Sequence, residues 1–415
     1  MRRNRVNDVE INNFNLYKNK WNIKSESIIK PGLDSIKKAL EKLDNPQNKH
    51  KTIHVAGTNG KGSTIAFMRA IAKEHGLSYG SFTSPSIIDV HDQIQLNGVN
   101  VKPEQMDMAF EKMQRANLSG MLTDFELLTV AAFLVFETET LDIVFIEAGM
   151  GGRFDSTNVF QKSLAVIPSI SIDHTNFLGD TIEKISWHKA GILKEDSKLI
   201  IGQLEPQAKT VFLQEALEKK GVIIEYGNDF IVHNNSYSYD KTVFNGLHPS
   251  MLGNHQKSNM AIAITALLES SFPLDESKVQ LAVKHARMQG RMERIEENLY
   301  FDGAHNKASI DSLVETIKSN FPHKNIHFIV GILKDKDYIY MLRKLEEIGS
   351  SFEFVQFNHE RALPPSELYK HCLHDDKRIT KDMEEFLFEN IQNNDITIVT
   401  GSLYFISELR LKTGK

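Results

Sequence analysis

The chain has 415 residues, of which 41% are hydrophobic, and its 49 basic and 54 acidic side chains leave a formal net charge of −5. This length exceeds the usual domain size of roughly 100–200 residues and predicts two or three domains. Because the charges are spread without long runs of one sign, the sequence offers no basic surface for nucleic acid, and we expect small-molecule partners.

Cysteine content and hydropathy indicate the compartment. A single cysteine, Cys372, excludes an internal disulfide and a cysteine-cluster metal site, as is typical of the reducing cytoplasm. The opening residues are basic but lack the apolar core of a signal peptide. The longest apolar stretch, LTVAAFLVF, is far shorter than the roughly 20 residues that a membrane span needs. We therefore expect a soluble cytoplasmic protein without a membrane partner.

Residues 53–67, IHVAGTNGKGSTIAF, resemble a phosphate-binding loop with altered spacing. The standard pattern has a glycine five residues before the second glycine and a Ser or Thr directly after the Lys. Here Val55 occupies the first position, and Gly62 separates Lys61 from Ser63. The preceding KTIHVAG predicts a buried strand, and STIAFMRAIAKEHG predicts a helix that ends at a glycine.

This strand–loop–helix context favours a nucleotide site, because backbone N–H groups and a helix N-terminus converge on one anion there. The glycines permit close backbone approach, Lys61 supplies a charge for the β and γ phosphates, and Ser63 or Thr64 supplies a hydroxyl. A glycine-rich turn without a ligand is the alternative interpretation. The strand, the lysine and the helix together favour nucleotide binding.

Two later segments repeat this order. LDIVFIEAGMGGRFDSTN predicts a buried strand that ends at Glu147, and AVIPSISIDHTNFLGD predicts another that ends at Asp173 and His174. Ligands collect at the carboxyl ends of strands in open α/β sheets, so we expect Glu147 and His174 to face the phosphate loop. Oxygen ligands with one imidazole favour Mg²⁺ over zinc. Taken singly, each is more commonly structural, as a capping or core histidine and a strand-end salt-bridge partner.

The strand–helix alternation starts again near residue 290 with NLYFDGAHN, IHFIVGILKDKD, FEFVQFN and ITIVTGSLYFI, and helical stretches are predicted at 335–349 and 382–393. This half contains no phosphate loop. We therefore predict an α/β protein in which residues 1–289 form a larger, P-loop-type ATP-binding domain with a mainly parallel sheet. Residues 290–415 are predicted to form a smaller, Rossmann-like α/β domain.

Several short motifs occur in this sequence in the same order as in one protein family. They are PGLDSIKKALEKLDNPQ, GTNGKGST, TSPS, TDFELLT, EAGMGGRFDSTN, SIDHTNFLGDTIEKISWHKAGI, HQKSNMAIA, GRMER, DGAHN and TGSLYF, from about residue 31 to 405. The chain thereby resembles the dihydrofolate synthase and folylpolyglutamate synthase family of the Mur ligase superfamily, where an extra residue after the loop lysine is itself typical. The resemblance implies that ATP phosphorylates a folate carboxylate and that the amine of L-glutamate attacks the acyl phosphate.

The resemblance also implies roles for individual residues. Magnesium would be held by Ser84, Glu147 and His174, and Lys61 and Mg²⁺ would supply the positive charge that phosphoryl transfer needs. Lys189 in WHKAGI matches the lysine that the family carries as a carbamate, which requires a neutral amine. An ordinary lysine paired with Glu147 or phosphate is the alternative. The implied ATP contacts are Thr58, Asn59, Gly60, Lys61, Gly62, Ser63, Thr64, Asn259, Arg291 and Asp302.

The substrate side is implied by further matches. His305 and Ser402 match positions associated with the incoming glutamate or its activation, although a loop histidine is as commonly structural. The matching folate-side residues are Gly32, Leu33, Phe125, Glu126, Arg153 and Asp155. Phe125 can stack on a pterin and Glu126 can accept from its amino groups. TDFE equally predicts Thr123 capping a helix with Glu126 at its third position, and the two roles are compatible.

The chain departs from the family after TSP. TSPSIIDVHDQIQLNG has Ser86 for the usual histidine, Asp92 for a glutamate and Gln93 for an arginine, whose bidentate contact glutamine cannot replace. The acceptor is therefore open: a reduced folate, dihydropteroate, both, or another carboxylate joined by a paralogous ligase. A nucleotide-binding regulator or simple NTPase fits the loop but does not explain the accompanying Glu147, His174 and Lys189. The resemblance implies a monomer and leaves K⁺ dependence open.

Overall fold

The computed structural model describes residues 13–26, 32–380 and 395–413. The chain divides into two compact units. The first unit comprises Met1–His248 and Ser258–His285, and the second unit comprises Pro249–Lys257 and Ala286–Lys415. Residues 249–257, which the predicted boundary after residue 289 places in the first domain, group with the second unit; the boundary itself stays a prediction. The helix predicted at 382–393 lies outside the described residues.

The first unit is built on an eight-stranded sheet in the order β4-β3-β2-β5-β1-β6-β7-β8. Six of its strands run parallel, and β3 and β4 add an antiparallel edge, so the prediction of a mainly parallel sheet is confirmed. The strands are β1 (Thr52–Val55), β2 (Tyr79–Phe82), β3 (Ile94–Leu96), β4 (Val99–Asn100), β5 (Ile143–Glu147), β6 (Leu164–Ile167), β7 (Lys198–Ile201) and β8 (Val222–Glu225).

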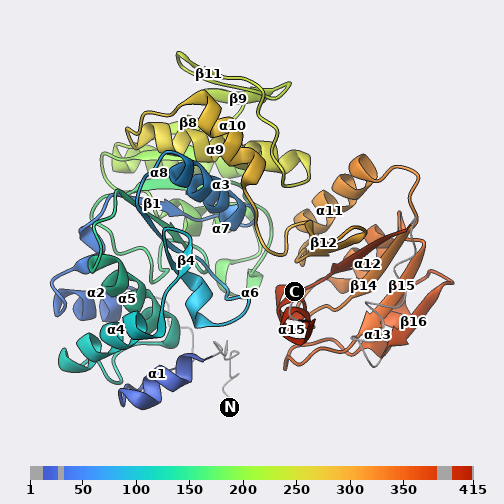
Figure 1. Ribbon diagram of the computed structural model, residues 1–415, viewed down its shortest axis with the longest axis horizontal. Helices are drawn as coiled ribbons and strands as arrows, with labels where there is room; N and C mark the ends of the chain where they lie inside the picture. Colours follow the sequence, from blue (N-terminus) through green and yellow to red (C-terminus); the bar gives the residue numbers. More distant parts are fainter. Residues whose placement is uncertain (1–12, 27–31, 381–394, 414–415) are drawn as a thin grey trace. The chain divides into compact units, whose positions relative to one another are not determined.

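Helices pack against this sheet and against one another, and the unit also contains a small antiparallel sheet (Figure 1). One of the helices, α9, begins in residues that group with the second unit. The helices are α1 (Phe14–Lys20), α2 (Asp34–Glu41), α3 (Lys61–Glu74), α4 (Pro103–Arg115), α5 (Asp124–Glu137), α6 (Thr175–Leu178), α7 (Ile182–Ala190), α8 (Pro206–Lys219), α9 (Asn254–Glu269) and α10 (Glu276–His285), with 3₁₀ turns at Pro46–Asn48 and Val90–Gln93. The small sheet contains β9 (Phe230–His233), β10 (Ser236–Tyr239) and β11 (Thr242–Phe244).

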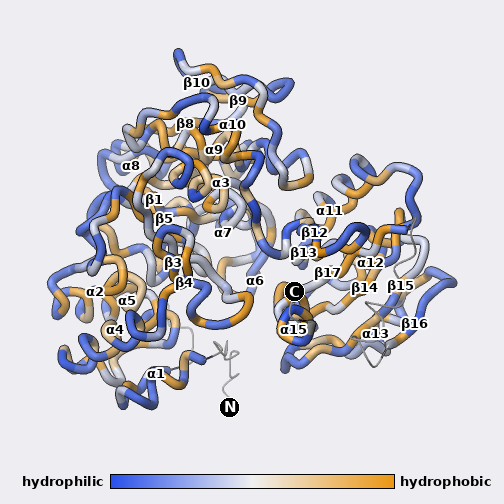
Figure 2. The backbone as a smooth tube through the Cα atoms, viewed as in Figure 1, coloured by the Kyte–Doolittle hydropathy of each residue, from blue (hydrophilic) through white to orange (hydrophobic). Residues whose placement is uncertain are grey.

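Burial explains why the central strands form. Every residue of β1 and of β5 is buried, as expected for parallel strands covered on both faces. Helix α5 is buried continuously from Glu126 to Phe136, and its side chains share one apolar cluster with residues of β5. A second cluster joins β6 and β7 to α8. Figure 2 shows these apolar stretches inside the first unit and hydrophilic residues along its outer loops.

The second unit contains a six-stranded sheet in the order β12-β13-β17-β14-β15-β16, parallel except for the β12–β13 pair. Its strands are β12 (Glu293–Glu296), β13 (Leu299–Asp302), β14 (Ile326–Val330), β15 (Ser351–Val355), β16 (Lys377–Thr380) and β17 (Ile396–Thr400). Its helices are α11 (Lys307–Asn320), α12 (Tyr338–Glu346), α13 (Pro365–His371) and α15 (Leu403–Thr413). The predicted second α/β unit is confirmed.

Two element boundaries differ from the sequence prediction. The strand expected to run to Asp173 and His174 ends at Ile167, because Pro168 has no N–H to continue the ladder. Residues 168–174 therefore form a loop. The helix expected at 335–349 spans Tyr338–Glu346. It begins at Tyr338 because the Asp337 side chain accepts a hydrogen bond from the Tyr340 N–H (3.2 Å) and caps it.

Burial predicts where this fold is sensitive to substitution. Leu128 of α5 is fully buried and Leu217 of α8 is 82% exposed. We expect Leu128→Ala to lower the free energy of unfolding by about 2–5 kcal/mol, because it leaves a cavity. Leu217→Ala is the matched control and should change it by less than about 0.5 kcal/mol. Urea unfolding followed by tryptophan fluorescence tests the first unit, which holds Trp21 and Trp187. Equal losses would contradict the assignment of this core.

Candidate active site

The phosphate loop connects the carboxyl end of β1 to the first residue of α3. Gly60 is the N-cap of α3 and has φ 86°, a left-handed conformation that glycine adopts without strain. A Cβ atom at Gly60 would lie 2.6 Å from Oδ1 of Asn259 and 3.0 Å from Cβ of Pro168. The structure thus brings two predicted ATP contacts, Gly60 and Asn259, together, and no side chain fits between them.

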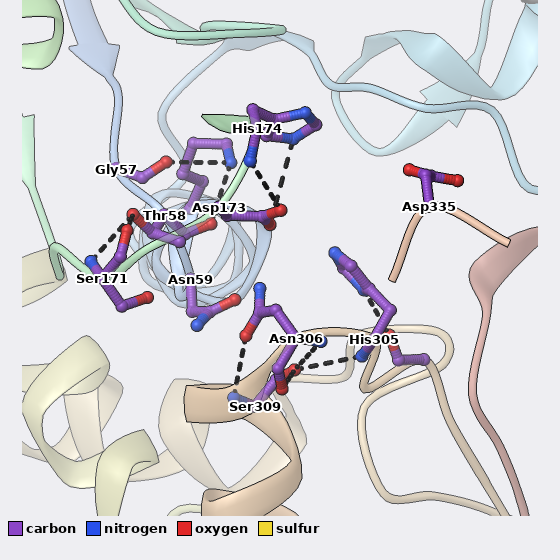
Figure 3. Close-up of polar contacts among 12 residues, drawn as sticks. Gly57, Thr58, Asn59, Ser171, Asp173, His174, His305, Asn306, Ser309 and Asp335 are labelled. Atoms are coloured by element: carbon purple, nitrogen blue, oxygen red, sulfur yellow. Dashed lines mark hydrogen bonds and ion pairs between the residues drawn. The ribbon is translucent and has the colours of Figure 1, made fainter. Parts of the chain in front are cut away.

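The loop after β6 holds the phosphate loop in place (Figure 3). The Thr58 N–H donates to the Ser169 carbonyl (2.9 Å). The Thr58 hydroxyl donates to the Ser171 carbonyl and accepts from the Ser171 N–H, both at 3.0 Å. The Asn59 N–H donates to the Ser169 hydroxyl (3.1 Å). The contacts of Ser169 and Ser171 with the phosphate loop were not predicted from the sequence. Serines that follow a proline show no local pattern that would indicate a contact more than 100 residues away.

Two lysines converge on one carbonyl of this loop. Lys61 Nζ donates to the Gly57 oxygen (3.2 Å) and the Thr58 oxygen (3.3 Å), and lies 3.9 Å from Oε1 of Glu147. Lys189 Nζ, from α7, donates to the same Gly57 oxygen at 2.8 Å. The loop after β1, the end of β5 and the end of α7 therefore meet around two amino groups and one carboxylate.

The buried position of Lys189 changes its acid–base behaviour. Its side chain is 3% exposed. Burial and then the positive charge of Lys61 lower the pKa of Lys189 from 10.5 to about 7, while Asp173 and Asp155 oppose the shift. A large fraction of this amine is therefore neutral near pH 7, and a neutral amine is a nucleophile.

The three residues predicted to hold magnesium lie at or near the ends of three different elements. Glu147 is the last residue of β5 and pairs in register with Val55, next to the phosphate loop. Ser84 follows β2, and His174 is the N-cap of α6, with its N–H donating to the Asp173 carboxylate (2.8 Å).

This donor set is chemically suited to magnesium. Within the described ranges, no group of three or more His, Cys, Asp and Glu side chains lies close enough to hold a metal by itself. The magnesium site at Ser84, Glu147 and His174 stays a prediction. A hydroxyl, a carboxylate and an imidazole fit Mg²⁺, which keeps several positions for water and phosphate oxygens.

Asp155 organises the glycine-rich loop that follows β5. Its buried carboxylate accepts from the Met150 N–H (2.7 Å), the Thr157 N–H (3.0 Å) and the Thr157 hydroxyl (2.5 Å). Burial raises the pKa of Asp155, and these donors together with Lys61 counteract that shift. Both carboxylate oxygens of Asp155 thus accept hydrogen bonds from Met150 and Thr157. The predicted folate contact at Asp155 stays a prediction.

Arg153, another predicted folate contact, lies against α7 and α8. Its guanidinium forms an ion pair with Glu215, and its Nε donates to the Trp187 carbonyl (3.3 Å). The guanidinium carbon lies 4.2 Å from the centre of the Trp187 ring. These contacts hold the side chain on the protein, and the predicted folate contact stays a prediction.

The remaining folate-side predictions lie near α5 and α2. The helix-capping interpretation of TDFE is confirmed: the Glu126 carboxylate accepts from the Thr123 N–H (2.8 Å), and the Thr123 hydroxyl accepts from the Glu126 N–H (3.3 Å). Phe125 stacks on Phe82 with 5.9 Å between ring centres. Leu33 packs partly buried against the apolar cluster around α5 and precedes α2, and Gly32 before it has φ 134°.

The loop that departs from the family is held by its own residues. The Asp92 carboxylate accepts from the N–H groups of Ile87 (3.0 Å) and Ile88 (2.5 Å). Gln93 is 3% exposed, and its amide nitrogen lies 3.4 Å from the Thr83 oxygen. Its amide oxygen has no hydrogen-bond partner in the part of the chain that the structure describes. Gln93 therefore faces inward, and Ser86 lies half-buried in the same loop.

In the second unit, the predicted site residues follow β13 and β17. The Asp302 carboxylate accepts from the N–H groups of Met292 (2.8 Å) and Ala304 (2.9 Å). Burial raises the pKa of Asp302, and nearby Arg291 opposes the shift. Arg291 is itself half-buried. The ATP contacts predicted at Asp302 and Arg291 stay predictions.

Two further residues of this unit were predicted to act on glutamate. The His305 Nδ1 lies 2.8 Å from the Gly303 carbonyl, which can only accept, so Nδ1 carries the hydrogen (Figure 3). Ser402 is 1% exposed, and its hydroxyl accepts from the Tyr404 N–H (3.2 Å) at the start of α15. Ser402 thus caps a helix, and the substrate roles of His305 and Ser402 stay predictions.

Comparison with known proteins identifies the family. The Mur ligase middle domain family matches residues 55–267, and the Mur ligase glutamate ligase domain family matches residues 290–403. The dihydrofolate synthase/folylpolyglutamate synthase of Bacillus subtilis is 35% identical over 408 residues, covering 92% of this chain and 95% of that protein. The chain belongs to the dihydrofolate synthase/folylpolyglutamate synthase family.

Solved structures of this family share its fold. The folylpolyglutamate synthase of Thermotoga maritima has a TM-score of 0.83 and 30% identity, covering 93% of this chain and 94% of that chain. The bifunctional enzyme of Yersinia pestis complexed with AMPPNP and Mn ion has a TM-score of 0.87 and 25% identity, covering 99% of this chain and 100% of that chain. Among the described residues, no helix is long and apolar enough to cross a membrane.

The tight contact at Gly60 yields a direct test of the loop. We expect Gly60→Ala to weaken ATP binding by about 10-fold or more, because the added methyl group would displace Asn259 or the loop. Gly120→Ala is the matched control: Gly120 also has positive φ (76°), but a Cβ there meets nothing within 4 Å. Calorimetric titration with Mg-ATP measures both variants. Unchanged affinity in Gly60→Ala would contradict the assignment of this loop to ATP.

Proposed function

We propose that this protein is an ATP-dependent ligase that adds L-glutamate to the carboxylate of a reduced folate, and that it also acts on dihydropteroate. The observation that carries the proposal is the convergence of Lys61 and Lys189 on the Gly57 carbonyl, with Glu147 3.9 Å from Lys61. A simple phosphate loop requires one lysine. Lys189, on the separate helix α7, is a second lysine, placed where it can take part in a reaction of the transferred phosphoryl group.

Side chains and backbone N–H groups of this protein account for the phosphorylation of the acceptor carboxylate. A carboxylate is a poor electrophile, and phosphorylation gives it a leaving group that an amine can displace. Lys61 and the N–H groups at the start of α3 bind the phosphates and stabilise charge as it moves to the acceptor. Ser84, Glu147 and His174 are the proposed magnesium ligands, and bound Mg²⁺ supplies further positive charge there. The Yersinia pestis complex with AMPPNP and Mn ion supports a divalent metal as a cofactor.

The remaining predicted contacts divide by substrate. For ATP we propose residues 58–64 and Asn259, together with Arg291 and Asp302 of the second unit. For L-glutamate we propose His305 and Ser402, whose stretch lies in the matched glutamate ligase domain. For the folate we propose Gly32, Leu33, Phe125, Glu126, Arg153 and Asp155. We further propose a cytoplasmic monomer, and K⁺ as an additional cation.

Lys189 is the proposed site of a carbamate. The neutral amine attacks CO₂ and loses a proton, which forms an N–C bond and one negative charge. Burial and Lys61 both favour the neutral amine, and the resulting anion would reduce the repulsion between the two lysines.

A second candidate function rests on the loop of Ser86 and Gln93. The arginine that the family usually has is replaced by an inward-facing glutamine. A ligase with the same nucleotide machinery and a different acceptor carboxylate fits this loop. The acceptor must therefore be identified by experiment.

Phosphate release with defined acceptors tests the function. The purified protein receives Mg-ATP and glutamate with tetrahydrofolate or with dihydropteroate, and products are identified by mass spectrometry. We expect turnover with both, dependent on glutamate, and a loss of about 10²–10³-fold or more in Lys61→Ala. Lys184→Ala, on the exposed face of α7, is the matched control. Turnover with neither folate would favour the second candidate, and ADP release without any acceptor would indicate an NTPase.

The carbamate is tested separately with ¹³C-bicarbonate. A carbamate carbon signal should appear in the wild type and in Lys184→Ala and be absent from Lys189→Ala. Because the pKa of Lys189 is lowered from 10.5 to about 7, its amine is neutral above about pH 7 and protonated below it. The signal and the activity should therefore fall together as the pH drops through 7. A signal that persists in Lys189→Ala would place the label elsewhere.

A further inference from the structure

A fully buried histidine lies on β1, two residues before the phosphate loop. His54 has no exposed surface, and its ring contacts Phe160 edge to face, with 5.6 Å between ring centres. Its Nε2 lies 2.8 Å from the hydroxyl of Thr157, which is also fully buried. None of the proposed binding or catalytic roles uses either residue.

The direction of these hydrogen bonds follows from their partners. The Thr157 hydroxyl and the Thr157 N–H both point to Oδ1 of Asp155, at 2.5 Å and 3.0 Å. A carboxylate that receives these donors accepts, so the hydroxyl hydrogen is committed to Asp155. The hydroxyl oxygen must then accept from His54, and the hydrogen of the ring lies on Nε2. The chain of donors runs from His54 through Thr157 to Asp155.

His54 is suited to be a permanent neutral donor. Burial, and secondarily the charge of Lys194, lower the pKa of His54 to about 3, so the ring stays uncharged across the physiological range. With the hydrogen on Nε2, Nδ1 is an acceptor, and it has no hydrogen-bond partner among the described residues. Keeping a buried acceptor without a partner is costly, and an apolar residue would avoid that cost. The donor at Nε2 explains why a histidine stands here.

The far end of this chain of donors reaches the groups proposed for catalysis. Oδ2 of Asp155 accepts from the Met150 N–H (2.7 Å) and so closes the loop that begins directly after Glu147. The same loop packs on α7, because the Arg153 N–H donates to the His188 oxygen (2.6 Å). A Cβ at Gly152 would lie 3.1 Å from Cα of Lys189. The loop fixed by Asp155 thus lies between Glu147 and Lys189.

We propose that His54 is a positioning residue for the ligase reaction. By donating to Thr157 it orients the hydroxyl that holds Asp155, and through Asp155 it sets the loop that places Glu147 and Lys189. This inference rests on the proposed ligase function. It assigns to His54 an effect on the phosphoryl-transfer step without any contact to substrate.

The test replaces His54 by glutamine or asparagine, two amide side chains of different length. Glutamine places its amide nitrogen near the position of the histidine Nε2, whereas asparagine places it near Nδ1 and cannot reach Thr157. We expect His54→Asn and His54→Leu to lower kcat by about 10–100-fold, as outer-shell substitutions typically do, with KM for ATP little changed. His54→Gln should recover most of kcat. Equal impairment of His54→Gln and His54→Asn, or full activity in His54→Leu, would overturn the proposal.

A second pair of variants changes Thr157, the middle residue of the hydrogen-bond series from His54 to Asp155. Thr157→Ser keeps the hydroxyl, and Thr157→Val removes it at nearly constant shape. We expect Thr157→Val to resemble His54→Leu, Thr157→Ser to stay near wild type, and the Leu–Val double variant to be no worse than either single one. Additive losses would overturn the proposal even if the histidine variants fold poorly. Absent wild-type turnover would refute the ligase function, whereas wild-type turnover with active Thr157→Val would refute the positioning role alone.

Discussion

The site depends on the placement of two lysine amino groups on one backbone carbonyl. Lys61 and Lys189 both donate to the oxygen of Gly57, and the charge of Lys61 adds to burial in lowering the pKa of Lys189. Lys61 also lies 3.9 Å from Oε1 of Glu147, whereas Lys189 is buried and its pKa is lowered to about 7. Near pH 7 the buried lysine is therefore in large part a neutral amine.

The fold produces this arrangement through the order of its strands. β1 and β5 are parallel neighbours, and Val55 pairs with Glu147, so the phosphate loop and the carboxylate emerge at the same edge of the sheet. The loop after β6, the next neighbour of β1, carries the serines that hold Thr58 and Asn59. α7 then returns Lys189 to this edge. Each group is placed by a strand end or a helix end, which restricts its freedom before any ligand binds.

Local patterns in the sequence were sufficient for part of this account. The strand, glycine loop and helix around Lys61, the strand end at Glu147 and the capping role of Glu126 all follow from residues close in sequence. The strand after residue 164 was predicted too long, because its apolar pattern continues past Pro168. Arg153 binds Glu215 and Trp187, and His54 binds Thr157, over separations of 34 to 103 residues. Such pairings depend on tertiary packing, which local periodicity does not encode.

The central claim is that the γ phosphate of ATP is transferred to the acceptor carboxylate, and that ATP is not simply hydrolysed by water. It is tested by labelling both oxygens of the acceptor carboxylate with ¹⁸O and analysing the phosphate released in the presence of glutamate. Attack of the carboxylate on the γ phosphorus leaves one of its oxygens on that phosphate when the amine displaces it. We predict one ¹⁸O atom per phosphate released, matched by one amide formed. Unlabelled phosphate would show that ATP is hydrolysed by water and would contradict the account.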